Sequence, residues 1–313
     1  MEIFTLSLPF IPKSGICATI GFFDGVHGGH RYLLEQLRKM AKEKNQKSAV
    51  ITFRNHPRTC LQADYIPKLL TSTEEKLNRI AQLGIDYCFL LDFTPDLARM
   101  TAEEFISRVL SKKLHIQSLL IGYDHRFGKD RSNGFKDYVR FGQSQGMEVI
   151  QAKELHKQKD SISSTLIRHK IRDKAIEEAN ECLGQPYTLE GKVVRGNQLG
   201  QKIGFPTANL EISEPEKLIP PVGIYAVRTH VDGRKYPGMA YIGKRPTVSN
   251  EGEERVEVHI IGFSGDLYNS NLQMEFIRFL RDDRRFNSLE ELKKQLEIDK
   301  EGAESANAIF GNS

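Results

Sequence analysis

The first half of the chain alternates between short apolar runs and amphipathic stretches. Apolar runs that indicate buried strands lie at residues 16–22, 48–53, 87–93, 118–121 and 147–151. Between them, residues 32–41 carry apolar side chains at 33, 34, 37 and 40, the spacing of one helical face. Ser72 with Glu75, and Thr101 with Glu104, have the spacing of a capping box that begins a helix. This alternation predicts a doubly wound, Rossmann-like α/β domain with parallel strands and ligands at their carboxyl ends.

The pattern changes near residues 184–186, where Gly184 and Pro186 end a helical stretch at residues 170–182. Beyond this point the apolar residues recur with a period of two, in strand candidates at residues 189–195, 223–230, 236–242, 255–263 and 272–279. Several short strands require their edges to be closed, which favours a small antiparallel barrel. A final helix is predicted from Ser288 to about residue 297. We therefore expect two domains, residues 1–183 and 184–313.

Composition excludes several classes of protein. In 313 residues there is no apolar run long enough to span a membrane, and the first 13 residues lack the pattern of a secretory signal. The formal net charge of +4 is spread over 45 basic and 41 acidic residues, without the basic stripe of a nucleic-acid-binding protein. The cysteines are scattered, without metal-ligand spacing, which favours a cytoplasmic location and argues against zinc: Cys17, Cys60, Cys88 and Cys182.

A glycine-rich motif, GFFDGVHGGH, lies between the first predicted strand and the first predicted helix. His27 and His30 are three residues apart and share one face of the first helical turn, where backbone N–H groups already favour an anion. Two imidazoles there can donate hydrogen bonds to phosphate oxygens, which suits attack on an α-phosphate with pyrophosphate leaving. The alternative is a glycine-rich turn with two surface histidines, which the placement between strand and helix disfavours. The candidate phosphate-binding residues are Gly21, Phe22, Asp24, Gly25, His27 and His30.

Three further segments supply candidates for the same site. Ser163, Ser164 and Thr165 place hydroxyls at a predicted helix start, with Arg168 one turn later, an arrangement that can hold two phosphates. Taken alone, this segment is better explained as an ordinary N-cap with a surface arginine. Asp124 and Asn55 each follow a predicted strand and so lie at carboxyl ends. A solvated loop or a simple turn explains them as well.

A second glycine-rich segment occupies residues 191–210. Its Gly200, Gly204 and Pro206 precede Thr207 and Asn209, which are two residues apart and point the same way on an extended chain. A hydroxyl and an amide oxygen are hard ligands that suit Mg²⁺ on ATP, although a polar hairpin explains the segment equally well. On the strand at residues 256–260, Glu257 faces away from the valines and can accept a proton from an alcohol that attacks a γ-phosphate. A solvent-facing carboxylate is the commoner reading of such a residue.

The chain resembles, over nearly its whole length, the prokaryotic bifunctional riboflavin kinase/FMN adenylyltransferase family. The strings that carry the resemblance are GFFDGVHGGH, GYDHRFG, SSTLIR, GQKIGFPTANL, GIYAVR, IGKRPTV, VEVHIIGFSGDLY and FIRFLRDDRRFNSLEELKKQL. The resemblance implies an N-terminal adenylyltransferase domain related to HxGH nucleotidylyltransferases and a C-terminal six-stranded flavokinase barrel. Riboflavin, FMN, FAD and ATP would be the small molecules bound, with Mg²⁺ as cofactor.

The resemblance also implies roles for the candidates. His27 and His30 would bind ATP phosphates, helped by Arg168 and the turn at residues 163–165, with Asp124 and Asn55 in the same site. Thr207 and Asn209 would bind Mg²⁺-ATP, and Glu257 would act as base on the riboflavin 5′-hydroxyl.

The chain departs from the family pattern at three positions. His125 replaces a usual Phe, Gln201 a basic residue, and Tyr241 a usual Asn. None of them removes a catalytic group, so both activities are expected. The alternatives are an enzyme with only one active domain, a flavin-sensing binding protein, and an HxGH transferase for another substrate.

Overall fold

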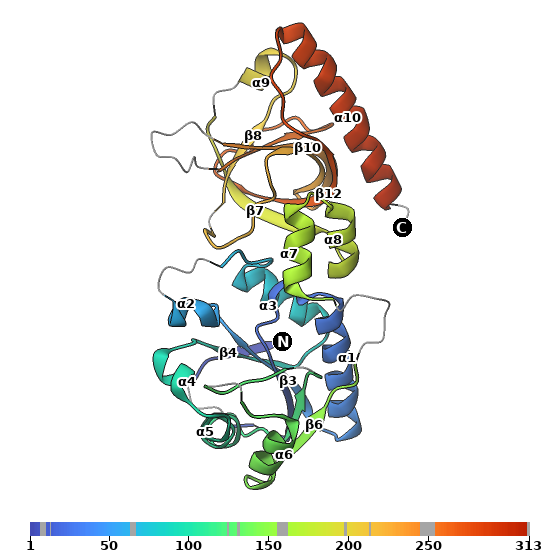
Figure 1. Cartoon of the computed structure of the whole chain (residues 1–313). Helices are drawn as coiled ribbons and strands as arrows, with labels where there is room; N and C mark the ends of the chain where they lie inside the picture. Colours follow the sequence, from blue (N-terminus) through green and yellow to red (C-terminus); the bar gives the residue numbers. More distant parts are fainter. Residues whose placement is uncertain are drawn as a thin grey trace. The chain divides into compact units, whose positions relative to one another are not determined.

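The computed structural model describes residues 1–6, 11–12, 14–62, 67–123, 125–129, 132–154, 162–196, 199–212, 214–244 and 254–311 (Figure 1). The chain forms two compact units, Met1–Ser163 and Ser164–Ser313. Two helices that precede the predicted boundary at residue 183, α7 (Ser164–Arg172) and α8 (Ile176–Leu183), fall in the second unit.

The first unit is built on a sheet of parallel strands, as predicted. The strands are β1 (Glu2–Phe4), β2 (Ile16–Ile20), β3 (Lys47–Phe53), β4 (Tyr87–Leu91), β5 (Ser118–Ile121) and β6 (Glu148–Gln151). Their order is β1-β4-β3-β2-β5-β6, and every neighbouring pair is parallel. Strand β1 was not predicted, because three residues at an edge are too short to show a period.

Helices cover both faces of this sheet, which is why its strands are apolar on both sides. Ile16 and Ala18 of β2 belong to the cluster that includes η2 (Phe105–Ser111) and α6 (Phe135–Gln143), whereas Cys17 between them belongs to the cluster with α1 (Gly28–Glu43). Alternate residues of one strand thus fill two separate cores. The helices are η1 (Asp24–Val26), α1 (Gly28–Glu43), α2 (Pro57–Leu61), α3 (Thr73–Gln82), α4 (Pro95–Arg99), α5 (Ala102–Glu104), the π-helical η2 (Phe105–Ser111) and α6 (Phe135–Gln143). Both predicted capping boxes are confirmed, at the starts of α3 and α5.

The second unit contains the predicted six-stranded antiparallel barrel. Its strands are β7 (Tyr187–Val194), β8 (Ala208–Glu211), β9 (Gly223–Val231), β10 (Arg234–Lys244), β11 (Glu254–Ile260) and β12 (Asn271–Arg281). They close in the order β10-β11-β8-β7-β12-β9 with antiparallel neighbours. The rings of Tyr187 and Tyr225 pack on Phe276, and all three side chains are fully buried.

Helices pack against the outside of the barrel. Buried Asn180 of α8 donates to the Phe276 carbonyl and accepts from the Tyr187 N–H, both at 2.8 Å, so α8 is fixed to the barrel wall. The short α9 (Leu199–Lys202) precedes β8. The final helix α10 (Leu289–Gly311) lies along the barrel and is longer than predicted (Figure 1). Its second half is held by small residues, Ala303 and Ala306, which are buried against β9 and β10 and carry little hydrophobic signal in the sequence.

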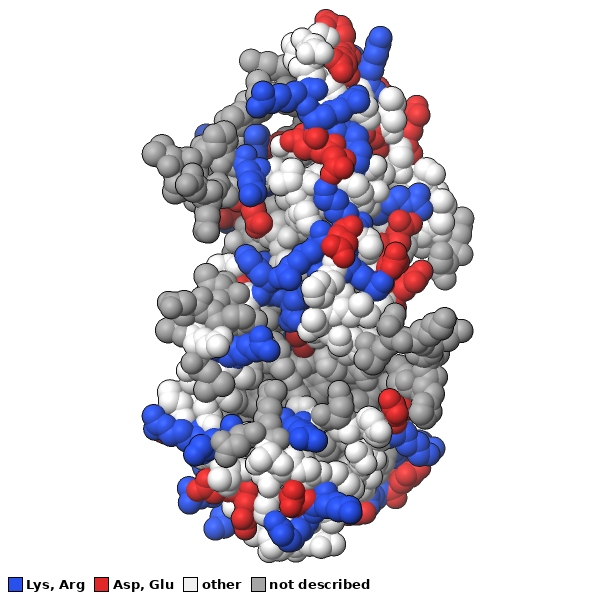
Figure 2. Space-filling model, viewed as in Figure 1, with Lys and Arg blue, Asp and Glu red and all other residues white. Residues whose placement is uncertain are grey.

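Charged side chains of both signs are interspersed on the face shown in Figure 2. In the second unit, Arg281 pairs with the buried Asp299, and Arg278 pairs with Glu177.

Candidate active sites

The HxGH motif lies at the point where the strand order of the first unit reverses. From β2 the chain proceeds through α1 to β3 on one side, whereas the neighbour of β2 on its other side is β5. The motif follows β2, and residues 122–123 and 125–129 follow β5, so both segments emerge at carboxyl ends beside the reversal. Leu33 of α1 would lie 3.8 Å from a Cβ on Gly122, which shows how close the two segments are. Open α/β sheets bind their ligands at such a point.

His27 and His30 are brought together at the start of α1. Their ring centroids are 3.7 Å apart and the planes differ by 21°. His27 is 5 % exposed, and the buried Nδ1 of His30 has no hydrogen-bond partner in the described part of the chain. The pair therefore presents imidazole nitrogens at a helix N-terminus, as predicted.

Burial is the main reason that the pKa of His30 lies well below its ordinary value. Electrostatic repulsion from His27, His125 and Lys76 lowers this pKa further. His30 is consequently neutral at pH 7, and a neutral imidazole donates one hydrogen bond while its other nitrogen accepts.

Glycines let the backbone close tightly around the pair. Gly25 has φ of 80°, in the left-handed region. A Cβ on Gly29 would lie 3.3 Å from the His27 ring and 3.6 Å from the Ile162 carbonyl oxygen. The backbone at Ile162 thus lies close to the first turn of α1, and the predicted role of Ser163, Ser164, Thr165 and Arg168 in this site stays a prediction.

Asp24 and Asn55 brace the loops at this edge of the sheet. Asp24, 3 % exposed, accepts hydrogen bonds from the Leu70 and Thr71 N–H groups and from the Thr71 hydroxyl. The Asn55 amide donates to the Phe93 carbonyl at 3.0 Å and accepts from the Phe93 N–H at 2.8 Å. These bonds tie the ends of neighbouring segments together, and the predicted contact of both side chains with substrate stays a prediction.

The remaining candidates of the first site are placed as follows. Gly21 comes directly after β2, and Phe22 is half-buried with its ring edge-on to His56. Ser163 ends the first unit, while Ser164, Thr165 and Arg168 lie on α7, which begins at Ser164 as the sequence predicted. Asp124 lies outside the described residues.

Helix α3 contributes two side chains that the sequence analysis missed. Lys76 and Arg79 both reach the end of the sheet, and the Arg79 guanidinium donates to the Gly25 carbonyl at 3.1 Å. The spacing in the sequence could have indicated that Lys76 is buried. It lies four residues before the fully buried Ile80 and therefore on the same, inward face of the helix.

The second site brings together Thr207, Asn209 and Glu257 where strands β8 and β11 pair. Asn209 of β8 is directly opposite Glu257 of β11 in the strand register. The Thr207 hydroxyl donates to Glu257 Oε2 at 3.1 Å, and the Arg255 guanidinium contacts the same carboxylate. Glu257 is buried, with 9 % of its surface exposed, as are its neighbours Val256 and Val258, so it is not a solvent-facing carboxylate.

Asn209 is a candidate metal ligand on geometric grounds. Its Oδ1 is buried and has no hydrogen-bond partner within the described ranges. A Cβ on Gly196 would lie 2.1 Å from the Asn209 amide nitrogen, so the close approach of the glycine segment requires glycine there. Gly200 is constrained in the same way, since its Cβ would lie 2.2 Å from the Phe205 carbonyl oxygen. Gly204, with φ of 87°, and Pro206 complete the turn that leads to Thr207.

Two recesses flank strand β8. One, of 600 Å³, runs from Thr207 and Pro206 to residues 263–268 and includes Gln201. The other, of 670 Å³, adjoins Asn209 and Arg255. Both have the volume of a small-molecule pocket and lie beside the polar cluster.

Tyr241, one of the departures from the family pattern, is opposite Glu257 in the register of β10 and β11. Its hydroxyl donates to Asp283 Oδ2 at 3.0 Å, and its ring lies over Gly243, where a Cβ would approach the hydroxyl to 2.4 Å. Tyr241 therefore borders the site without displacing Glu257.

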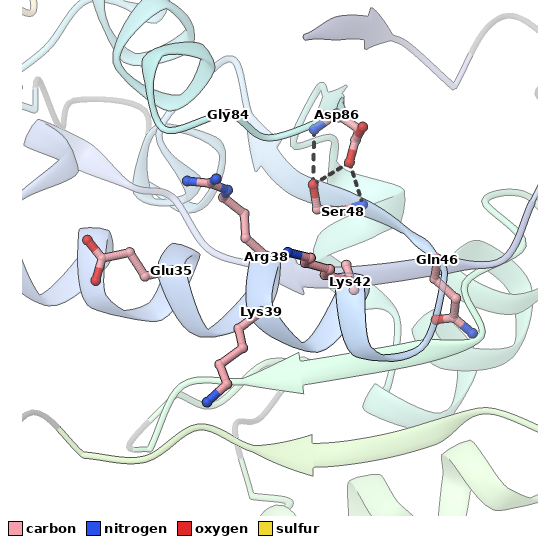
Figure 3. A pocket seen from close by; sticks show the side chains of 9 residues that line it. Glu35, Arg38, Lys39, Lys42, Gln46, Ser48, Gly84 and Asp86 are labelled. Atoms are coloured by element: carbon pink, nitrogen blue, oxygen red, sulfur yellow. Dashed lines mark hydrogen bonds between the residues drawn. The ribbon is translucent and has the colours of Figure 1, made fainter.

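A third recess, of 490 Å³, lies at the opposite, amino end of the strands in the first unit (Figure 3). Its cations are Arg38, Lys39 and Lys42, against Glu35 and Asp86. Asp86 is already bonded to the Ser48 hydroxyl at 2.7 Å and paired with a lysine outside the recess. This recess is separate from the HxGH edge.

No group of three or more His, Cys, Asp or Glu side chains among the described residues has the arrangement of a metal centre. No helix among them is long and apolar enough to cross a bilayer.

Comparison with known proteins gives matches over both units. A family model described as FAD synthetase matches residues 12–166, and one described as riboflavin kinase matches residues 183–307. The bifunctional riboflavin kinase/FMN adenylyltransferase of Escherichia coli (strain K12) is 37 % identical over 289 residues, covering 92 % of this chain and 91 % of that protein. The protein of the same name from Listeria monocytogenes is 35 % identical over 283 residues, covering 90 % and 89 %.

A solved structure is similar over the whole length. It is described as a macrolide-efflux protein from Streptococcus pneumoniae and has a TM-score of 0.89 and 31 % identity, with 97 % of this chain and 99 % of that chain covered. The relative from Bacillus subtilis (strain 168), again a bifunctional riboflavin kinase/FMN adenylyltransferase, is 34 % identical and covers 91 % of this chain and 90 % of its own.

Proposed function

The chain belongs to the bifunctional riboflavin kinase/FMN adenylyltransferase family, and on that premise we propose which of its residues carry the two reactions. The enzyme phosphorylates riboflavin with ATP to give FMN, and then transfers the adenylyl group of a second ATP to FMN, giving FAD and pyrophosphate. The HxGH unit carries the second reaction and the barrel carries the first.

In the barrel, Glu257 is the general base. It takes the proton of the riboflavin 5′-hydroxyl while that oxygen bonds to the γ-phosphorus, and the bond to the β,γ-bridging oxygen breaks so that ADP leaves. The observation that carries this assignment is the hydrogen bond from Thr207 to Glu257, which fixes the carboxylate on a rigid strand beside Asn209. The adjacent recesses have room for the two substrates.

Mg²⁺ would be held by Thr207 and Asn209. The buried, unpartnered Oδ1 of Asn209 fits a hard cation, and a hydroxyl and an amide oxygen are suitable ligands for one that also binds phosphate oxygens. When bound, the ion neutralises charge on the ATP phosphates. Gly200, Gly204 and Pro206 shape the turn that brings the backbone close to ATP.

In the HxGH unit, a phosphate oxygen of FMN bonds to the α-phosphorus of ATP, and the bond to the α,β-bridging oxygen breaks as pyrophosphate leaves. The nucleophile is already anionic, so the protein mainly positions the phosphates and stabilises charge. His27 and His30 donate to the α-phosphate oxygens. The hydroxyls of Ser163, Ser164 and Thr165, with Arg168, hold the departing pyrophosphate, and Asn55 and Asp124 border the same site.

Two further assignments accompany the proposal. We place the division between the catalytic halves at residues 183 and 184, next to the point where the riboflavin kinase family model begins. The enzyme works in the cytoplasm, where ATP is available and its four free thiols stay reduced.

The test is one incubation of the full chain with riboflavin, ATP and Mg²⁺, with the flavins separated by chromatography over time. We expect FMN first and FAD later, with release of pyrophosphate. FMN alone would mean that the HxGH unit is silent or takes another substrate. Binding of riboflavin without any product would favour a flavin-sensing protein.

A further inference from the structure

Lys76 is a buried cation at the edge of the sheet that carries the HxGH motif. It lies in the first turn of α3, is 2 % exposed, and its Nζ donates to the Phe53 carbonyl oxygen at 2.7 Å. The same Nζ lies 4.3 Å from the centroid of the Phe22 ring. Phe53 ends β3, and Phe22 belongs to the motif that follows β2, so one ammonium group bridges the ends of two neighbouring strands.

Among the described residues, no carboxylate forms a hydrogen bond or an ion pair with this ammonium. Lys76 forms no ion pair among the described residues, and the nearby Asp24 carboxylate accepts its hydrogen bonds from Leu70 and Thr71. One carbonyl and one aromatic face satisfy an ammonium only in part, since it has three N–H donors. Burying a charge without a counter-ion is costly, and a neutral side chain of the same length would brace the fold at lower cost.

The field of Lys76 reaches the histidine pair. It is one of the charges that lower the pKa of His30. One turn later on the same helix, Arg79 donates to the carbonyl of Gly25, so α3 directs two cations toward the loop of residues 22–25. A phosphate bound at His27 and His30 would supply the negative charge that Lys76 lacks.

We propose that Lys76 is a positioning residue for adenylyl transfer. Its ammonium holds Phe22 and the Phe53 carbonyl next to the HxGH turn, and its positive charge stabilises the bound phosphates. This inference rests on the proposed FMN adenylyl transfer by the first unit. Lys76 acts through the backbone and through its field, and FMN and ATP contact the histidines.

The titration of Lys76 gives a signature that a purely structural lysine would lack. Burial lowers its pKa to about 8, against the opposing charge of Asp24. Two other titratable groups face Lys76. Burial raises the pKa of Cys88 of β4 to about 12, and His30 of α1 stays neutral. Lys76 therefore loses its charge as the pH rises through about 8, and kcat/KM for FAD formation should fall over the same range.

The experiment compares full-length wild type, Lys76→Met, Lys76→Arg and the control Lys39→Met, whose side chain is 80 % exposed. FAD formation from FMN and ATP is followed from about pH 6 to pH 10, and phosphorylation of riboflavin is measured in the same samples. We expect Lys76→Met to lower kcat/KM for FAD formation by roughly 10- to 100-fold while riboflavin phosphorylation is unchanged. Lys76→Arg, which stays charged, should recover part of the activity and lose the alkaline decline. Lys39→Met should match wild type.

Two results would overturn the inference: FAD formation by Lys76→Met within about twofold of wild type, or an alkaline decline that persists unchanged in Lys76→Arg. If neither variant folds, the wild-type profile decides, since the absence of a decline near pH 8 is incompatible with the role. A wild-type chain that makes no FAD at all would instead refute the proposed adenylyl transfer, and the role of Lys76 with it.

Discussion

Replacement of Glu257 by Gln tests the kinase mechanism with the smallest change of shape. The amide oxygen can still accept the hydrogen bond that the carboxylate receives from Thr207 at 3.1 Å, so the side chain should keep its position. What is lost is the negative charge and the capacity to take a proton. Because Glu257 is only 9 % exposed, bulk water cannot readily replace it as the base.

The expected loss follows from the role of a general base. Positioned bases contribute about 10²- to 10⁴-fold to a rate, which corresponds to about 3 to 5 kcal/mol of activation free energy at 1.36 kcal/mol per decade. The loss should appear in kcat for FMN formation, with little change in KM for riboflavin, because the amide fills the same space. The first unit does not use Glu257, so conversion of supplied FMN to FAD should be unaffected.

The assay measures initial rates of ADP and FMN formation from riboflavin, and of FAD formation from FMN, on one preparation. Glu304→Gln, which removes an exposed carboxylate on α10, is the matched control and should behave as wild type. Retention of FMN formation within about threefold would refute Glu257 as the base. A parallel fall of both reactions would refute the assignment of two separate sites.

Four further predictions concern single side chains. Asn209→Ala should raise the Mg²⁺ concentration needed for half-maximal FMN formation by roughly 10-fold or more, measured by Mg²⁺ titration at saturating ATP, and an unchanged requirement would exclude Asn209 as a ligand. His30→Ala should lower FAD formation by about 10²- to 10³-fold while FMN formation persists, and equal losses in both rates would contradict the separation of sites. Burial raises the pKa of Asp86, but hydrogen bonds, led by the one from Lys47, outweigh this effect and hold the pKa below its ordinary value. The stability that this carboxylate adds is present above the ordinary pKa and is lost as the pH falls through the lowered pKa. Asp86→Asn should therefore make acid unfolding less steep, and an unchanged unfolding curve would count against this prediction. The lowering of the Lys76 pKa from 10.5 to about 8 costs the folded state about 3 kcal/mol at pH 7. This cost decreases as the pH rises toward 10.5, so any gain in Tm of Lys76→Met should be larger at pH 7 than at pH 10. A Tm difference that does not depend on pH would contradict the burial cost.

Much of this protein follows from local patterns in its sequence. The change from alternating strands and helices to a period of two separated the α/β half from the barrel half, because side chains repeat every two residues on a strand and every 3.6 on a helix. Capping boxes at Ser72 and Thr101 marked helix starts that the structure confirms, since their hydrogen bonds involve only residues three apart. The HxGH and GFPTAN segments were found for the same reason, as their residues are neighbours in the chain.

Relations between distant residues required the tertiary structure. The pairing of Asn209 with Glu257 depends on the register of two strands that lie far apart in sequence, and no local pattern fixes that register. Asp24 and Asn55 resemble substrate-binding residues in sequence, yet their polar atoms also hold Leu70, Thr71 and Phe93, contacts that only folding creates. The length of α10 depended on small alanines whose burial comes from the barrel beneath them.

Lys76 shows most clearly what the sequence alone does not predict. In the sequence it is one lysine among 45 basic residues, and lysines are mostly exposed. The sequence placed it on a helix, on the same face as Ile80. Only the packing of α3 against the ends of β2 and β3 made it a buried cation beside the HxGH turn, because burial and electrostatic field are properties of the folded surroundings and not of the residue itself.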